Sequence, residues 1–183
     1  MFSSFPLLLS ILGEPGATIE NFIEKEGWKA CVQEKGWFDT RVGQIWIEKV
    51  LAQHVHDAEN AFLLVDHFSV HLKSDFVKTV NNLGVDVDFI PAGYTCVLQP
   101  VDVGVNAPFK AALSDFHHTW CLEKYPQTLN TDKLPTPERK DVYEWVLRSY
   151  EQISVHSIQK TFMHVGFLSK DTVIDTDDDE TLK

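Results

Sequence analysis

The sequence has no apolar run near the roughly 20 residues needed to cross a bilayer, so no membrane segment is expected. Its three cysteines, Cys31, Cys96 and Cys121, are odd in number, widely spaced and free of any C-x-x-C pair. This spacing argues against a disulfide framework and a zinc site, and it fits a reducing intracellular compartment. Basic residues are also scarce: 16 Lys and Arg stand against 27 Asp and Glu, for a net charge of −11.

This acidic balance is unfavourable for a nucleic-acid binder, because Lys and Arg normally supply most of the non-specific affinity for phosphate. Part of the charge is local. Residues 171–183 carry six acids against one lysine, a balance of −5, which leaves −6 on residues 1–170. The chain alone therefore has no obvious basic surface for binding DNA. Residues 169–183, acidic and without aromatics, are expected to be a disordered tail.

What is present suits one globular domain. The length of 183 residues and the hydrophobic content of 44% are sufficient for a real core, which we assign to residues 1–168. The apolar stretch 6–12 resembles the hydrophobic part of a secretory signal sequence, but no basic region precedes it. With the Gly/Pro-rich turn at 13–16 after it, the stretch is better interpreted as a buried strand.

Hydrophobic spacing predicts the remaining elements. The expected strands are 28–33, 62–65 and 85–90. The expected helices begin with a short turn at 18–26, a helix of about 13 residues with Thr40 or Asp39 as its N-cap and a helical stripe from Phe76 to Leu83 that Gly84 ends. A long helix from Val101, with irregular first turns at Gly104 and Pro108, is followed by helices at 137–151 and 154–163, the last with Ser154 as its N-cap. Trp37 and Trp46 are expected in the core. Asp86 and Asp88 alternate with apolar residues and are expected to face solvent.

One acid stands out because of what precedes it. The apolar residues Phe62 to Val65 predict a short strand, buried on both faces, in a mainly parallel sheet. Asp66 then lies at the carboxyl end of that strand, the edge at which open α/β sheets bind ligands. The alternative is that Asp66 simply begins a loop or caps the following helix.

A second acid follows in the stretch Thr95–Lys110. Asp102 comes after another apolar segment, which we interpret as a second strand, and 35 residues separate it from Asp66. Asp102 also falls in the first turn of the long helix expected from Val101. The positive end of the helix dipole would help to keep this carboxylate ionised for a cation.

The two stretches together resemble a known family. Leu-Leu-Val-Asp-x-x-x-x-His, followed by Leu-Gln-Pro-Val-Asp-Val-Gly-Val-x-x-Pro-Phe-Lys, is similar to the DDE superfamily endonuclease domain of pogo/Tigger/jerky-type transposases and their domesticated relatives. The resemblance implies an α/β, RNase H-like fold with additional C-terminal helices. It also implies that Asp66 and Asp102 are the second and third metal-binding carboxylates, with Mg²⁺ or Mn²⁺ as cofactor, DNA as partner and a nuclear location.

The resemblance also suggests auxiliary residues. His71 matches a histidine five residues after the second acid, for which two roles stay open: positioning phosphate or a metal-bound water, or packing with a backbone hydrogen bond. Cys96 and Gln99 are candidates for orienting Asp102. The other histidines considered are expected at the surface or in packing roles: His67, His117, His118 and His164.

The first acid of the family has no counterpart. In the family this carboxylate bridges two divalent cations from a strand that should precede the Phe5–Ile11 strand, and the chain begins at Met1. We therefore expect an incomplete fold that lacks the first catalytic strand. No other acid is expected to substitute, because none follows an apolar strand: the candidates are Asp39, Asp57, Glu59 and Asp75.

The resulting prediction is a domain that is inactive as a nuclease. The edge of the 62–65 strand would be exposed, so the chain is expected to aggregate, to associate with another protein chain or itself, or to fill the gap with its own Phe5–Ile11 strand. Two alternatives stay open. The chain is either a domesticated non-enzymatic scaffold that binds DNA or protein, or part of an active metal-dependent endonuclease whose N-terminal part is missing here.

Overall fold

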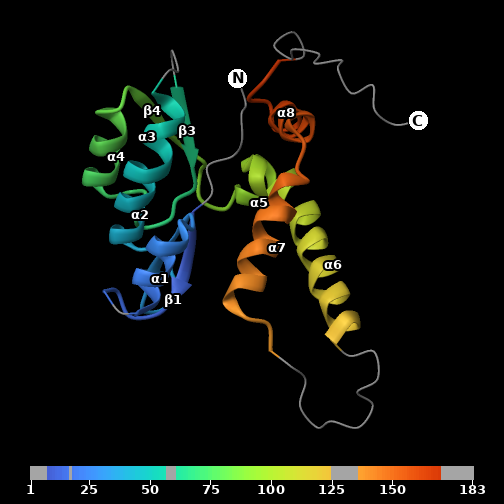
Figure 1. Cartoon of the computed structure of the whole chain (residues 1–183). Helices are drawn as coiled ribbons and strands as arrows, with labels where there is room; N and C mark the ends of the chain where they lie inside the picture. Colours follow the sequence, from blue (N-terminus) through green and yellow to red (C-terminus); the bar gives the residue numbers. More distant parts are fainter. Residues whose placement is uncertain (1–7, 17, 57–60, 125–135, 170–183) are drawn as a thin grey trace. The chain divides into compact units, whose positions relative to one another are not determined.

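The structure, a computed structural model, describes four stretches of the chain: residues 8–16, 18–56, 61–124 and 136–169. The chain divides into two compact units, Met1–Thr95 and Cys96–Lys183. The first mixes strands and helices, and the second is helical (Figure 1). None of the helices in the described stretches is both long and apolar enough to span a membrane. The expected single domain over residues 1–168 stays a prediction.

The first unit begins with a parallel strand pair. Strand β1 (Leu9–Leu12) pairs with β2 (Ala30–Gln33), and helix α1 (Thr18–Glu26) connects them. These elements confirm the predicted helix at 18–26 and the strands, although residues 6 and 7 lie outside the described stretches. The prediction that the first strand is buried was wrong at its end, since Leu12 is 59% exposed. Only the alternate face of β1 packs against the small core formed around Ile23.

The next helix is continuous but not uniform. Helix α2 (Thr40–Trp46) runs through a π-helical segment, η1 (Ile47–Leu51), into α3 (Ala52–Val55). Asp39, one of the two residues predicted for this role, is the N-cap, and its Oδ1 accepts the Val42 N–H at 2.9 Å. Trp46 packs against the core, but Trp37 is 66% exposed, so its predicted core position was wrong. Trp37 precedes the cap and lies outside the helical stripe that reaches the core.

The cap gives a pH-dependent prediction. The hydrogen bond from the Val42 N–H holds the pKa of Asp39 below its usual 3.8. Its stabilisation is therefore fully present above that pH and is lost as the pH falls through the lowered folded-state pKa. We expect Asp39→Ala to reduce the free energy of unfolding by about 1 kcal/mol near neutral pH, and by progressively less in acid. Urea unfolding at several pH values, with the exposed Asp86→Ala as control, measures this difference.

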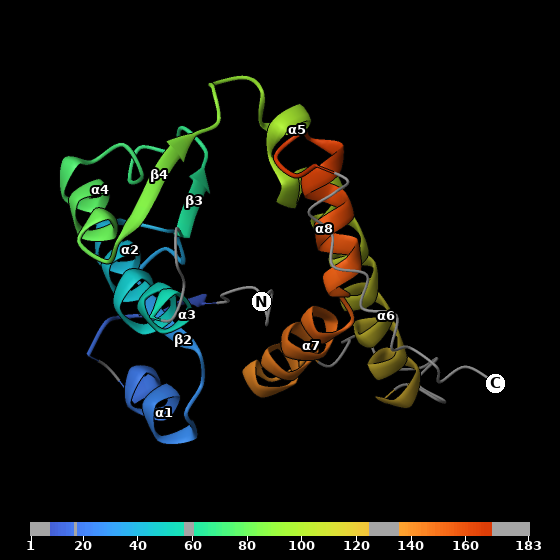
Figure 2. The ribbon, with the colours of Figure 1, turned by 90° about the horizontal axis from the view of Figure 1, so that it is seen from above.

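The second strand pair supports the first candidate acid. Strands β3 (Ala61–Val65) and β4 (Val85–Phe89) are parallel, with Val65 opposite Phe89. Helix α4 (Ser74–Asn81) connects them along the chain and lies beside β4 (Figure 2). Gly84 has φ +76°, which suits the turn after the helix. The core beneath is formed by residues of η1, α4 and β4 and one from the loop after β3: Ile47, Leu51, Val70, Phe76, Val80 and Val85.

The predicted burial of β3 on both faces was wrong. Ala61 and Leu63 pack against the core, whereas Phe62, on the opposite face, is 49% exposed. Asp86 and Asp88 of β4 are exposed, as predicted. Within the described stretches β3 pairs with β4 alone, and β1 pairs with β2 rather than with β3. The predicted filling of the place beside β3 by the N-terminal strand is therefore not seen in β1.

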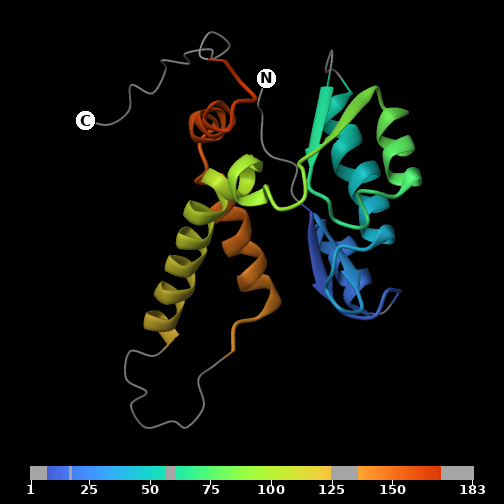
Figure 3. The same cartoon turned by 180° about the vertical axis from the view of Figure 1, so that it is seen from behind.

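The second unit consists of helices. After a short helix, α5 (Thr95–Leu98), a π-helical segment η2 (Val101–Val105) leads directly into α6 (Asn106–Lys124); α7 (Arg139–Glu151) and α8 (Val155–His164) follow. Helix α6 packs against α7, and η2 packs against α8 (Figure 3). The predicted helices are confirmed, including the Ser154 N-cap, whose Oγ accepts the Ser157 N–H at 3.1 Å. The predicted tail begins at residue 169, and residues 170–183 lie outside the described stretches.

The prediction of a strand before Asp102 was wrong, because this segment is helical. The Asp102 and Val103 N–H groups donate to the Gln99 carbonyl at 3.1 and 3.0 Å. Pro100 has φ −55°, a value that suits a helix start, where its missing N–H costs nothing. The irregular turn predicted at Gly104 appears as the π-helical segment, whereas Pro108, for which the same was predicted, lies within α6.

Candidate functional site

The first candidate acid lies at the end of β3, as predicted. Asp66 follows Val65 directly, and its Oδ1 accepts the Phe68 N–H at 3.2 Å and an N–H from His71 Nδ1 at 2.8 Å. The side chain of Asp66 is 34% exposed and that of His71 is 19% exposed. Asp66 therefore also begins a loop, which was the alternative prediction for this residue. Its carboxylate stabilises the turn after the strand and stays accessible.

His71 is held in place by aromatic rings. The ring centroids of Phe38, Phe68 and Phe76 lie 5.5, 5.8 and 5.2 Å from that of His71. The Nδ1 atom also lies 3.3 Å from the Asp66 carbonyl oxygen. His71 therefore has the packing and the backbone contact that formed one of its two predicted roles. The contact to the Asp66 side chain was not predicted, and it limits the orientations of the carboxylate. A role toward phosphate or water stays a prediction.

The second candidate acid lies on η2 of the other unit. Asp102 is exposed, and its Oδ1 accepts an N–H from Asn106 Nδ2 at 2.5 Å. Sequence reasoning did not single out Asn106, although a four-residue spacing on a helix indicates neighbouring side chains. Cys96 is exposed, and Gln99 contributes its backbone carbonyl. Asn106 thus holds the side chain of Asp102, and roles for Cys96 and the Gln99 side chain stay predictions.

A close approach holds the turn that carries Asp102. A Cβ placed on Gly104 would lie 2.2 Å from Thr161 Oγ1 and 2.9 Å from Cγ2. Thr161 is itself buried on α8, and its Oγ1 donates to the Ser157 carbonyl at 2.8 Å. Only a residue without a side chain leaves room for this contact between η2 and α8.

The remaining histidines fit the predicted surface or packing roles. His67 makes an edge contact with Phe89, with ring centroids 5.9 Å apart. His117 contacts Trp120 and Trp145. His118 and His164 are exposed.

Asp66 and Asp102 have the right chemistry to bind a divalent cation, but they supply only part of the ligands that such an ion needs. Carboxylate oxygens are the ligands that Mg²⁺ and Mn²⁺ prefer, and Asp66 and Asp102 each present one. Over the described stretches, however, no three His, Cys, Asp or Glu side chains group closely enough to hold a metal. Asp66 and Asp102 belong to different units, so their pairing at one centre stays a prediction. Within each unit, the described residues do not form a complete two-metal site.

Asp66 at the end of β3 and Asp102 on η2 are thus two candidate carboxylates, one in each unit of a protein that mixes helices and strands. A family model described as "DDE superfamily endonuclease" matches residues 12–162 and includes both acids. The chain belongs to the DDE superfamily endonuclease family. It is also similar to two curated proteins with the name "Pogo transposable element with KRAB domain", one from Mus musculus and one from Homo sapiens.

Both relatives are 25% identical to the chain over 129 residues, which cover 69% of this chain and 21% of each relative. The chain thus spans about a fifth of the length of the curated relatives it matches. No solved structure matches it. The parallel strand pairs and abundant helices are compatible with the α/β fold that the family implies; the predicted incompleteness of that fold stays a prediction.

Proposed function

We propose that the chain is a transposase-derived DDE endonuclease-like domain that acts on DNA, with Asp66 and Asp102 as ligands of Mg²⁺ or Mn²⁺. The observation that carries this proposal is that both acids lie within the residues matched by the family. Each also has one oxygen held by a neighbouring side chain, His71 or Asn106. A ligand oriented in this way loses less freedom when it binds a cation. A nuclear location follows from DNA as the substrate.

We further propose that the described residues do not cleave DNA by themselves. A pair of divalent cations about 4 Å apart repels strongly and needs shared anionic ligands. Within its own unit, neither Asp66 nor Asp102 belongs to a group of three His, Cys, Asp or Glu side chains that could hold a metal, over the described residues. Two separate carboxylates are insufficient for such a pair.

The test is a cleavage assay with the purified chain, Mn²⁺, and supercoiled or pre-nicked DNA. We expect no cleavage that depends on Asp102, so Asp102→Ala and the unchanged chain should behave alike. The matched control is Asp115→Ala, an exposed acid on α6. Cleavage that is lost in Asp102→Ala and kept in Asp115→Ala would instead support the alternative of an active endonuclease that is completed by residues from elsewhere.

Metal binding is tested separately from cleavage. We expect Asp66→Asn to weaken Mn²⁺ binding, measured by electron paramagnetic resonance of the free ion, about tenfold or more. Asp86→Asn, which changes an exposed acid on β4, should leave it unchanged. Equal binding by both variants would contradict the assignment of Asp66.

The second candidate function is a non-enzymatic scaffold that binds protein or DNA. It is favoured by the balance of −6 over residues 1–170 and by the exposed Phe62 on β3. A stable oligomer without affinity for DNA, measured by light scattering and gel shift, would support a protein-binding scaffold. A DNA shift that disappears at high salt would count against it.

A further inference from the structure

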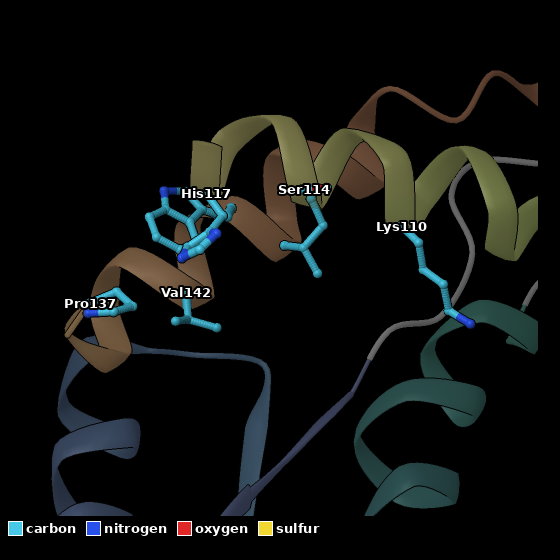
Figure 4. A pocket seen from close by; sticks show the side chains of 7 residues that line it. Lys110, Ser114, His117, Pro137 and Val142 are labelled. Atoms are coloured by element: carbon cyan, nitrogen blue, oxygen red, sulfur yellow. The ribbon is translucent and has the colours of Figure 1, made fainter. Parts of the chain in front are cut away.

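A groove lies between α6 and α7 of the second unit (Figure 4). Its volume is about 370 Å³, which is within the range of small-ligand sites. Its described lining combines one cation, aromatic rings, a hydroxyl and aliphatic groups: Lys110, Leu113, Ser114 and His117 from α6, and Val142 and Trp145 from α7. The mechanism of the acid site uses none of these residues.

One end of the groove is aromatic. The ring centroids of His117 and Trp145 are 5.7 Å apart, and those of Trp120 and Trp145 are 5.8 Å apart. His117 and Trp120 are nearly parallel, with an angle of 16° between their planes. The three rings support one another, which fixes His117 and Trp145 as the walls of this end. Flat, supported rings of this kind are suited to stacking a planar ligand.

The other end of the groove is basic. Lys110 precedes His117 by seven residues, about 10 Å along a helix that rises 1.5 Å per residue. The labelled side chains of α6 project toward the side on which Val142 and Pro137 lie (Figure 4). Among the described lining residues none is acidic, although the whole chain carries −11. The groove therefore complements a ligand with a planar group at one end and an anion at the other.

We propose that this groove binds an unpaired nucleotide of a single-stranded nucleic acid, with the base against His117 and Trp145 and a phosphate at Lys110. The spacing of the two ends suits a base and a phosphate of the same or the next nucleotide. The proposal rests on the proposed function only for the ligand class. Neither Asp66, Asp102 nor a metal takes part in this binding.

The test measures fluorescence anisotropy of labelled oligothymidylate of about 12 nucleotides at low salt, with EDTA present. We expect His117→Ala to weaken binding by about fivefold or more, the lower end of the effect of removing a stacking ring. Lys110→Gln should weaken it and should reduce the dependence of log Kd on log salt by about 0.7, the value for one phosphate contact on a single strand. The matched controls are His118→Ala and Lys160→Gln, which alter exposed side chains outside the groove lining.

Oligouridylate and a blunt duplex form the other arms. Tighter binding of oligothymidylate than of oligouridylate identifies DNA as the source of the nucleotide, and the reverse identifies RNA; both support the groove. Equal effects of His117→Ala and His118→Ala, a duplex that binds as tightly as the single strand, or no single-strand binding by the folded chain would each overturn the proposal. Because EDTA excludes metal chemistry, failure here is distinguishable from failure of the acid site.

Discussion

Gly104→Ala is expected to destabilise the second unit by about 2 kcal/mol. Overpacking a close contact typically costs about 1–3 kcal/mol, and the new Cβ would lie 2.2 Å from Thr161 Oγ1, far inside contact distance. Thr161 cannot rotate away without losing its hydrogen bond to the Ser157 carbonyl. The higher helix propensity of alanine offsets about 1 kcal/mol at most, so the clash dominates. Hydrogen exchange of η2 and α8 in the full chain, followed by mass spectrometry, measures the loss.

A double variant separates this clash from a general effect of the substitution. Thr161→Ala removes Oγ1 and Cγ2, two of the three atoms nearest the new Cβ. Gly104→Ala combined with Thr161→Ala should therefore lose less stability than the sum of the two single variants, by about 1 kcal/mol or more. Strictly additive losses would contradict the close approach of η2 and α8. Because Asp102 lies on η2, this contact also determines how firmly that acid is held.

Phe76→Ala should destabilise the first unit by about 3–5 kcal/mol, the usual cost of deleting a buried phenyl ring. Phe76 is 6% exposed in the core beneath β3 and β4, and its ring centroid lies 5.2 Å from that of His71. The variant thus loses core packing and one wall of the His71 site together. Urea unfolding followed by circular dichroism gives the free energy of unfolding.

The same substitution on β3 is the matched control. Phe62 is 49% exposed, so Phe62→Ala should cost less than about 1 kcal/mol. Similar losses for the two phenylalanines would mean that Phe62 is covered, by another segment or another chain. Such a result would favour the scaffold function, because a covered β3 face indicates a partner.

Local patterns predicted what depends on near neighbours. The N-cap at Asp39 needs only the Val42 amide three residues on, and the alternation of β4 places Asp86 and Asp88 on its polar face. The hydrogen bond from Asn106 to Asp102 also joins near neighbours, and the four-residue spacing of the two residues could have predicted it. Cap, strand and helix periodicities are set by backbone geometry, so they can be recognised in a single sequence.

Burial was predicted less well, because it depends on what covers a residue. Trp37 and Phe62 are large and apolar, yet both lie where the described fold covers them incompletely. The segment before Asp102 is apolar enough for a strand, but Pro100 and the bonds to the Gln99 carbonyl start a helix there. Hydrophobicity predicts that a side chain favours burial, but it does not predict which element packs against that side chain.

The sequence by itself identified the two acids, most of the helices and strands, and the family to which the chain belongs, because each of these depends on residues close together along the chain. Only the tertiary structure decided that His71 holds Asp66 among three aromatic rings, that Gly104 meets Thr161, and that α6 and α7 enclose a groove with Lys110 at one end and Trp145 at the other. The contacts of His71 with Phe38 and Phe76, the approach of Gly104 to Thr161 and the groove all bring together different parts of the chain, and their distances are set by how the elements pack.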